Sequence, residues 1–283
     1  NGRPLKACMT PLRRNMRIEP LRGLPALPAE EESGTFHETD DIAVDVLIIG
    51  GGPAGLTAAI ELGKAGIRTL LIDDKDKLGG KLVLQTHKFF GSVEDSFAGT
   101  RGFEIGALLE KEVRSLSSVE IWLDTAAIAV YSDKKVGVLK NNETYVLVTP
   151  RIILNATGAR EKSLPFPGNT LPGVYGAGTF QTLVNRDLVR ASDRLFIVGG
   201  GNVGLIAGYH ALQAGIDVVG LIEAQKEVGG YRVHKDKLMR MGVPVYTRHT
   251  VVSANGSDAV ESVTVASVDE RFQVIRGTEK TFP

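Results

Sequence analysis

Two stretches of the chain carry the same order of apolar and polar positions. Residues 50–80 and 199–230 each contain a glycine cluster, a helix-forming stretch, an Ala-Gly-Ile tripeptide, an apolar run that ends in an acid, and a Gly-Gly pair. The copies begin at Gly50 and Gly199, a spacing far longer than the roughly 20–50 residues of stacked repeats. The pattern therefore predicts two related domains.

Within each copy the hydrophobic pattern predicts a strand, a helix and a second strand. Val44–Ile49 is a short β-rich run that stops at glycine, as expected of a strand buried in a parallel sheet. Leu56–Lys64 has apolar residues at helical spacing, and Arg68–Ile72 is the next strand. The second copy repeats these elements at Arg194–Val198, Leu205–Gln213 and Asp217–Ile222. We expect an α/β fold with two Rossmann-like, three-layer dinucleotide-binding domains and an extended N-terminal arm.

Weaker patterns fill the rest of the chain. Between the copies, five apolar runs predict strands at Glu120–Leu123, Ala126–Tyr131, Lys135–Leu139, Thr144–Val148 and Arg151–Ala156. After the second copy we expect a helix at Tyr231–Met241 and strands at Pro244–Val252 and Val260–Val268. The predicted parts are an N-terminal arm with an acidic linker (residues 1–43), a first nucleotide-binding domain (residues 44–178) and a second one (residues 179–283).

Composition excludes several classes of partner. The chain has 33 Lys and Arg and 33 Asp and Glu, so no global field draws it to nucleic acid or to an anionic membrane. Its longest apolar stretch, Val44–Leu62, is broken by glycines and a proline, so it cannot be a membrane span, and no secretory signal is visible. Cys8 is the only cysteine, which excludes an intrachain disulfide and favours the cytoplasm. The five histidines show no paired ligand spacing, so we expect no metal site and assign no catalytic side chain.

The first glycine cluster predicts a dinucleotide site. Gly50, Gly52 and Gly55 follow a strand and open a helix, which is the context that the Gly-x-Gly-x-x-Gly fingerprint requires. Gly50 permits a tight turn, Gly52 permits close approach of a diphosphate, and Gly55 permits close packing of helix on strand. The helix N-terminus offers free N–H groups to the phosphates. Asp73 ends the second strand, where a carboxylate can accept hydrogen bonds from ribose hydroxyls.

The second cluster repeats this fingerprint with Gly199, Gly201 and Gly204, and Glu223 is its acid. A carboxylate there repels a 2′-phosphate and accepts from a free 2′-hydroxyl, which favours NAD(H) over NADP(H). Arg232 would reverse that preference if it reached the ribose, as would the neighbouring His234. A site for another adenine nucleotide remains an alternative.

Spacing alone does not distinguish FAD from NAD, but the segments GGGPAGLTAA, LIDDKDKLGGKL and LNATGAR resemble the FAD domain of flavoproteins with two dinucleotide-binding domains. The resemblance implies that Gly79 and Gly80 bring the chain under the flavin with Lys81 beside it. It also implies that Ala156, Thr157 and Gly158 cross beside the FAD. The other residues expected at the cofactors are Pro53, Ala54, Asp74 and Ala127 in the first domain and Asn202 and Val203 in the second.

The segments that flank these motifs resemble a smaller group within this class of flavoproteins. LPGVYGAGTFQTL and GGYRVHKDKLMRMGVPVYTRHTVV are similar to the α subunits of amine and amino-acid dehydrogenases of the sarcosine oxidase, dye-linked proline dehydrogenase and hydrogen cyanide synthase type. The Cys-x-x-Cys of thioredoxin reductases is absent from Leu171–Phe180, so no dithiol relay is expected. The first residues resemble the tail of a ferredoxin-like module, in which Cys8 is either the last ligand of a [2Fe–2S] centre or an inert thiol. The later Gly-Asp segment of these relatives is missing, so we expect a portion of a longer protein.

These observations predict an FAD-dependent oxidoreductase that passes hydride between NAD(H) and a bound flavin. Electrons would go on to a small-molecule or protein acceptor, or to a flavoprotein β subunit in amine or amino-acid oxidation, and an oligomer is expected. His87 and Lys88 follow the Gly-Gly turn and are candidates for contact with a substrate near the flavin. The alternative is a non-catalytic subunit that holds ATP or AMP and stabilises a complex.

Overall fold

The computed structural model of the chain describes residues 16–17, 23, 39–88 and 91–283. The chain divides into two units, residues 1–39 and residues 40–283. All helices and strands of the described residues belong to the second unit. Cys8, the ferredoxin-like tail and most of the acidic linker lie outside the described residues. The expected division into residues 1–43, 44–178 and 179–283 remains a prediction.

The first sheet has the strand order β3-β2-β1-β6-β5-β4. β1 (Asp41–Ile49) lies between β2 (Thr69–Ile72) and β6 (Thr144–Asn155), and β3 (Val119–Trp122) extends the sheet beyond β2. These four strands are parallel. β6 also pairs antiparallel with β5 (Val136–Lys140), and β5 with β4 (Ala126–Val130). The turn after β1 thus lies at the carboxyl edge of parallel strands, where α/β folds bind ligands.

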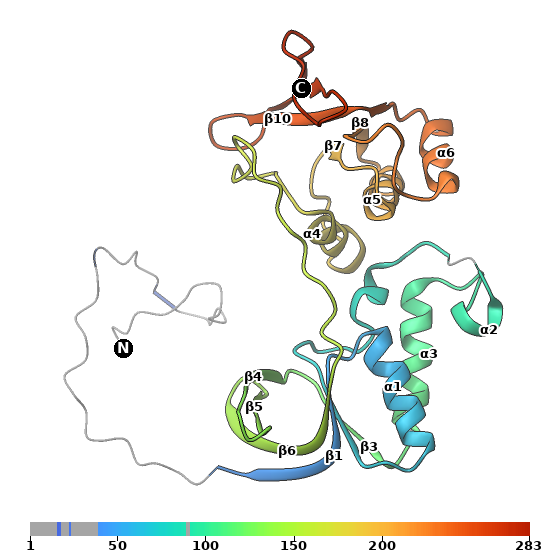
Figure 1. The fold of residues 1–283 in the computed structure, drawn as a ribbon, viewed down its shortest axis with the longest axis vertical. Coiled ribbons are helices and arrows are strands. Elements are labelled where there is room, and N and C mark those ends of the chain that lie inside the picture. Colours follow the sequence, from blue (N-terminus) through green and yellow to red (C-terminus); the bar gives the residue numbers. More distant parts are fainter. Residues whose placement is uncertain (1–15, 18–22, 24–38, 89–90) are drawn as a thin grey trace. The chain divides into compact units, whose positions relative to one another are not determined.

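Alternate residues of β1 point to opposite faces of this sheet, as a two-residue period requires. Val46 and Ile48 pack in one core with α1 (Pro53–Lys64) and α3 (Gly102–Arg114), whereas Leu47, between them, packs in another core with buried valines of β5 and β6. Figure 1 shows α1 and α3 on one side of the sheet and the β4–β6 strands curled over the other. The three layers are therefore helices, parallel strands and antiparallel strands.

The second copy builds the same layers. β7 (Arg194–Val198), β8 (Asp217–Glu223) and β9 (Val245–Thr247) form a parallel sheet that packs with α5 (Asn202–Gln213) and α6 (Arg232–Arg240). β10 (His249–Asn255), β11 (Ser262–Ser267) and β12 (Lys280–Phe282) form an antiparallel sheet. Ile222, Val251 and Val265 share a core that joins the two sheets. The predicted α/β fold with Rossmann-like units is confirmed.

One long strand replaces two predicted ones. Thr144–Val148 and Arg151–Ala156 were expected to be separate strands, but β6 runs through Pro150 without a break. β5 pairs with β6 only as far as Val148, so the strand has a single partner, β1, at the proline. A missing N–H is tolerated where a strand has an unpaired edge.

The predicted strand Pro244–Val252 is in fact two strands in different sheets. Arg248 lies between β9 and β10 with a φ of 54°, and this left-handed conformation redirects the chain after Thr247. β9 then completes the parallel sheet, while β10 begins the antiparallel one. The hydrophobic pattern is continuous across the break and does not reveal it.

α3 is absent from the predicted elements, although Ile105, Leu109 and Val113 lie four residues apart and are all buried. This spacing is typical of the apolar face of a helix. Five short elements were also missed: the 3₁₀ turn η2 (Gly80–Leu84), α2 (Val93–Ser96), α4 (Ala177–Gln181), the π-helical turn η3 (Thr182–Arg186) and the strand β12 (Lys280–Phe282). Each is shorter than two helical periods, so periodicity cannot detect them.

Candidate functional site

The first glycine turn, residues 50–55, joins β1 to α1 and cannot be built with larger residues. Gly50 has a φ of 108°, a conformation that side chains rarely adopt. A Cβ on Gly55 would lie 1.9 Å from the carbonyl oxygen of Gly50. Both positions therefore need glycine for the helix to start this close to the end of β1.

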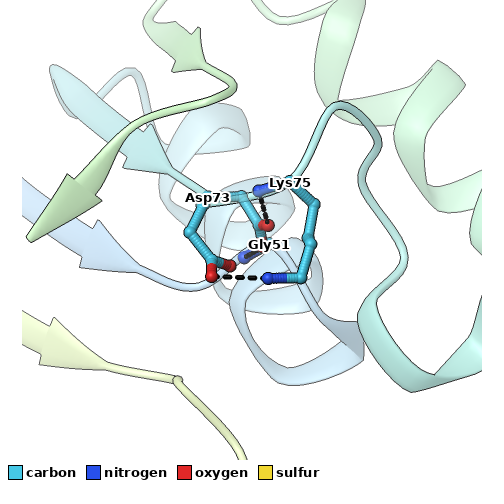
Figure 2. Close-up of polar contacts among 4 residues, drawn as sticks. Gly51, Asp73 and Lys75 are labelled. Carbon is cyan, nitrogen blue, oxygen red and sulfur yellow. Dashed lines mark hydrogen bonds and ion pairs between the residues drawn. The ribbon is translucent and has the colours of Figure 1, made fainter. Parts of the chain in front are cut away.

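Asp73 fixes the middle of this turn. Figure 2 shows its carboxylate accepting the backbone N–H of Gly51 at 2.6 Å and that of Lys75 at 2.9 Å. The side chain is only 8% exposed. Since each carboxylate oxygen has two lone pairs, both oxygens of Asp73 retain acceptor capacity beyond these contacts. Asp74 is exposed and pairs with the ammonium of Lys75.

The Gly-Gly pair packs directly on the first glycine turn. Gly79 has a φ of 109° and Gly80 a φ of 50°, and the N–H of Gly79 donates to the carbonyl of Gly51 at 2.8 Å. A Cβ on Gly80 would lie 2.8 Å from the Cα of Gly52. The backbone of η2 therefore approaches the turn closely, and Lys81 at its start is exposed.

Two segments distant in sequence complete this site. The N–H of Ala156 donates to the carbonyl of Ile49, and a Cβ on Gly50 would lie 2.5 Å from the carbonyl oxygen of Ala156. The hydroxyl of the next residue, Thr157, donates a hydrogen bond to the side-chain oxygen of Asn155. On the other side, the N–H of Thr125 donates to the carbonyl of Asp73 at 2.9 Å.

The predicted first-site residues therefore lie around one turn. Ala127 is partly buried in β4, just after Thr125. Gly158 has a φ of 74°, and a Cβ there would meet nothing within 4 Å.

The open side of the turn is the N-terminus of α1. The first bond inside the helix runs from the N–H of Leu56 to the carbonyl of Gly52, so the N–H groups of Ala54 and Gly55 precede the intrahelical ladder. Pro53 and Ala54 are exposed, and a Cβ on Gly52 would be 3.9 Å from its nearest neighbour. This surface offers backbone donors, a positive helix end and unobstructed backbone, which fits a diphosphate.

The second glycine turn, residues 199–204, repeats these contacts. Gly199 has a φ of 106°, and a Cβ on Gly204 would lie 2.1 Å from the carbonyl oxygen of Gly199. Glu223 accepts the N–H of Gly200 at 2.8 Å and that of Gln225 at 2.9 Å. A Cβ on Gly201 would meet nothing within 4 Å, and Val203 is exposed. This turn also leaves room for a diphosphate.

The second turn differs in how its Gly-Gly pair is held. Asn202 replaces the proline of the first turn, and its side-chain oxygen accepts the N–H of Tyr231 at 2.7 Å. Arg232 pairs with Asp236 of its own helix, with 3.4 Å between Nε and Oδ2. His234 has its ring 6.3 Å from that of His87. The two basic groups that were considered as ligands of a 2′-phosphate therefore have other neighbours.

His87 and Lys88 lie against the second copy. They line a cavity together with residues of α5 and α6, and the ring of His87 is 5.7 Å from that of His210. Burial lowers the pKa of His210 to about 4, helped by repulsion from His87 and Lys237. The sequence analysis did not single out His210, although its position between Ala207 and Ala211 on α5 places it on the buried face.

Two equivalent packing residues were also missed. A Cβ on Gly51 would lie within 2.3 Å of the Leu78 side chain, and one on Gly200 within 2.8 Å of Val228. Leu78 and Val228 precede the Gly-Gly pairs in the repeat, so aligning the two copies would have identified them.

Within the described part of the chain, no helix has the length and hydrophobicity needed to span a bilayer. Over the same residues, no group of three or more His, Cys, Asp or Glu side chains is arranged to hold a metal ion.

Comparison with known proteins supports the fold. Residues 44–276 match the family described as pyridine nucleotide-disulphide oxidoreductase. The chain is 28% identical over 235 residues to sarcosine oxidase subunit alpha of Rhizobium meliloti strain 1021, covering 78% of this chain and 22% of that protein. It is 28% identical over 252 residues to hydrogen cyanide synthase subunit HcnB of Pseudomonas protegens, covering 82% of this chain and 53% of that protein.

Among solved structures, L-proline dehydrogenase from P. horikoshii superposes with a TM-score of 0.61 at 22% identity, covering 88% of this chain and 42% of that one. At this identity the likeness concerns the fold. The chain spans 22% and 53% of the lengths of the two relatives above.

Proposed function

Since the chain belongs to the pyridine nucleotide-disulphide oxidoreductase family, we propose that it is part of an FAD-dependent oxidoreductase with a second site for NAD(H). The observation that carries this proposal is the duplicated glycine turn, closed in each copy by an acid on the second strand. Asp73 and Glu223 make equivalent contacts with Gly51 and Gly200. A single nucleotide site is compatible with many functions, whereas two sites with equivalent contacts are expected in a protein that binds two dinucleotides.

The first turn is proposed to bind FAD. Backbone N–H groups of Ala54 and Gly55 would hold the diphosphate, and the free lone pairs of Asp73 would accept from the ribose. Gly80 and Lys81 would lie under the flavin, because η2 approaches Gly52 closely. Ala156–Gly158 and Ala127 would line the remaining sides. Asp74 would meet the cofactor only at its exposed edge.

The second turn is proposed to bind NAD(H). Glu223 would accept from a free 2′-hydroxyl and would repel a 2′-phosphate. Arg232 pairs with Asp236 of its own helix, which reduces its attraction for a phosphate. Asn202 holds the Tyr231 amide, and Val203 and Gly204 present the first N–H groups of α5 to the diphosphate.

When both cofactors are bound, they supply the redox chemistry, because a reduced nicotinamide donates hydride to a flavin. The chain itself supplies position. Its glycines allow backbone contact with the diphosphates, its two acids orient the riboses, and its helix N-termini offset the phosphate charge. No side chain of the described residues is required as a nucleophile.

The proposed partners follow from the relatives. Sarcosine oxidase subunit alpha and HcnB are named as subunits, so we propose that this chain works in an oligomer with a flavoprotein β subunit that oxidises an amine or amino acid. Alternatively, a small molecule or another protein would accept the electrons instead of a β subunit. We propose the cytoplasm as the location, because Cys8 is the only cysteine.

Anaerobic titration of the FAD-loaded chain with NADH tests the proposal. Loss of the flavin absorbance near its long-wavelength maximum, at a rate that saturates with NADH, is the expected result. An unchanged spectrum with NADH demonstrably bound would contradict hydride transfer.

The alternative is a non-catalytic subunit whose second turn holds ATP or AMP. Isothermal titration with NADH, NADPH and ATP separates the two. Tight ATP binding combined with no flavin reduction would favour the alternative, whereas NADH binding with reduction would exclude it.

A further inference from the structure

A cavity of about 380 Å³ is lined by no residue of the two glycine turns. It is lined by the segment after η2, by Arg101 at the start of α3, by one face of α5 and by α6. None of the glycines or acids of the two turns lines it. The proposed nucleotide sites therefore do not account for it.

The lining of this cavity is basic. Lys88, Arg101 and Lys237 all contribute to it, and no acid does so among the described residues. None of these three cations forms an ion pair with a described residue. The ammonium of Lys237 lies 3.1 Å from the centre of the Tyr209 ring, an attraction that leaves its charge uncompensated.

The acids nearest to the lining residues in sequence are occupied elsewhere. Asp236, on α6, pairs with Arg232. Glu104, on α3, accepts the backbone N–H of Arg101 at 3.0 Å. Neither acid is among the residues that line the cavity, so the lining itself carries positive charge only.

Two histidines add titratable groups to the same wall. Burial lowers the pKa of His87, and repulsion from His234 and Lys237 lowers it further. Burial and Lys237 also lower the pKa of His234. Both side chains are therefore mostly neutral at pH 7, and both will gain charge readily if a negative group enters.

A third histidine, His210, is held next to His87 by a hydrogen bond with Asn185. The side-chain amide of Asn185 donates to the carbonyl of Leu84 at 2.7 Å and lies 2.8 Å from Nδ1 of His210. Nδ1 must then accept, which leaves the proton of the neutral ring on Nε2. His210 is 1% exposed, and its Nε2 has no hydrogen-bond partner among the described residues. The buried N–H of His210 thus has no acceptor among the described residues.

We propose that this cavity binds a small anion that carries a carboxylate or phosphate group, held by Lys237, Arg101 and Lys88 and contacted by His87 and His234. Lys237 is half-buried, so its attraction for an anion is the least screened by water, whereas Lys88 and Arg101 are exposed and add charge at the mouth of the cavity. The neutral histidines donate N–H groups to the anion. The cavity joins the segment after the first Gly-Gly pair to the helices of the second copy, so an occupant bridges the two copies.

The experiment uses the full chain labelled with ¹⁵N, and long-range NMR correlations of the histidine rings. Sulfate serves as the phosphate-like probe, because its charge is constant between pH 6 and 8, and succinate serves as the carboxylate probe. Ionic strength is held constant with chloride. Saturable shifts of His87 and His234 are expected, with both pKa values raised by about one unit at saturation. Stronger binding at pH 6 than at pH 8 is the matching result.

Matched variants locate the site. Lys237→Gln and, independently, Arg101→Gln are expected to weaken binding about tenfold or more. Lys235→Gln removes the same charge from α6 at a position that does not line the cavity, and is expected to bind normally. Thermal unfolding of each variant reports whether the fold is intact, so a misfolded Lys237→Gln leaves Arg101→Gln to decide.

The two probes separate the sources of the anion: preference for sulfate indicates a phosphate compound and preference for succinate a carboxylate. Absence of saturable shifts with both probes would overturn the proposal, as would equal shifts in Lys237→Gln and Lys235→Gln. These readouts need neither flavin nor NADH. A failure of nucleotide binding would therefore leave the anion result intact, and the reverse also holds.

Discussion

The carboxylate of Asp73 accepts the backbone N–H of Gly51, which lies 22 residues earlier in the chain. This bond ties the end of one strand to the turn that follows its neighbour. It gives the first glycine turn a fixed shape through a side chain instead of through backbone contacts alone. That the same carboxylate accepts hydrogen bonds from a ribose stays a prediction. Its bond to Gly51 is a second, structural role.

Replacing Asp73 by alanine should therefore destabilise the fold and also weaken FAD binding. The buried N–H of Gly51 would lose its acceptor, at a cost of about 1–3 kcal/mol. Urea unfolding of the apoprotein measures this cost without any cofactor. Asp76→Ala removes a nearby exposed carboxylate and should change stability by less than about 0.5 kcal/mol. Equal stability of the two variants would show that the Gly51 contact contributes nothing.

Two glycines of the second turn should respond in opposite ways to alanine. Gly204→Ala places a methyl group 2.1 Å from the carbonyl oxygen of Gly199, so it should lower the melting temperature substantially. Gly201→Ala meets nothing within 4 Å, so the fold should tolerate it, whereas a bound diphosphate should not.

Calorimetry with NADH and thermal unfolding separate these effects. For Gly201→Ala we expect at least about tenfold weaker NADH binding, which corresponds to about 1.4 kcal/mol, with FAD retained at the first turn. Unchanged NADH affinity in a folded Gly201→Ala would mean that the nucleotide does not approach this backbone.

Glu223→Gln should shift the nucleotide preference. Glutamine keeps one oxygen, which can accept the N–H of Gly200, loses the acceptor of the Gln225 N–H, and removes the charge that opposes a 2′-phosphate. NADPH affinity should rise about tenfold relative to NADH. Titrations of both nucleotides against the wild type and the variant provide the ratio. If the ratio stays constant, Glu223 does not face the ribose.

Acid should weaken the fold through His210. Its pKa is about 4 in the folded chain and 6.5 as the ordinary value, so the unfolded chain binds more protons between these values. Stability is therefore highest above pH 6.5 and falls as the pH drops toward 4, by up to about 3 kcal/mol for this residue alone. His87 and His234 add to the same trend, because their pKa values are also lowered.

Urea unfolding at several pH values between 4 and 7 measures this slope. His210→Gln should flatten it, since glutamine has no proton to gain. His249→Gln, in β10 and outside the cluster, is the matched control and should retain the wild-type slope. A slope that His210→Gln leaves unchanged would assign the acid sensitivity to other groups.

Repeats and periodicity predicted the elements that touch the glycine turns. The strands β1, β2, β7 and β8 and the helices α1 and α5 were anticipated because each is apolar over most of its length and recurs in both copies. Their contacts follow from backbone geometry, which the fingerprint encodes directly. Gly55 against Gly50 and Gly204 against Gly199 are examples.

Other features escaped prediction because they depend on pairing between distant segments. The continuity of β6 through Pro150 depends on where β5 stops, and the break at Arg248 depends on which sheet each side joins. The basic cavity combines residues more than a hundred positions apart, such as His87 and His234. No local pattern of a single sequence contains that proximity.

The hydrogen bonds of Asp73 and Glu223 also affect the rate at which a nucleotide binds and the free energy that is lost in ordering the backbone on binding. Because each turn is already closed by its own acid, a ligand meets a preorganised surface and spends little of its affinity on ordering the backbone. Association should then be fast and nearly independent of conformational exchange, and selectivity should reside in the rim of each turn, where Pro53 in one copy is replaced by Asn202 in the other.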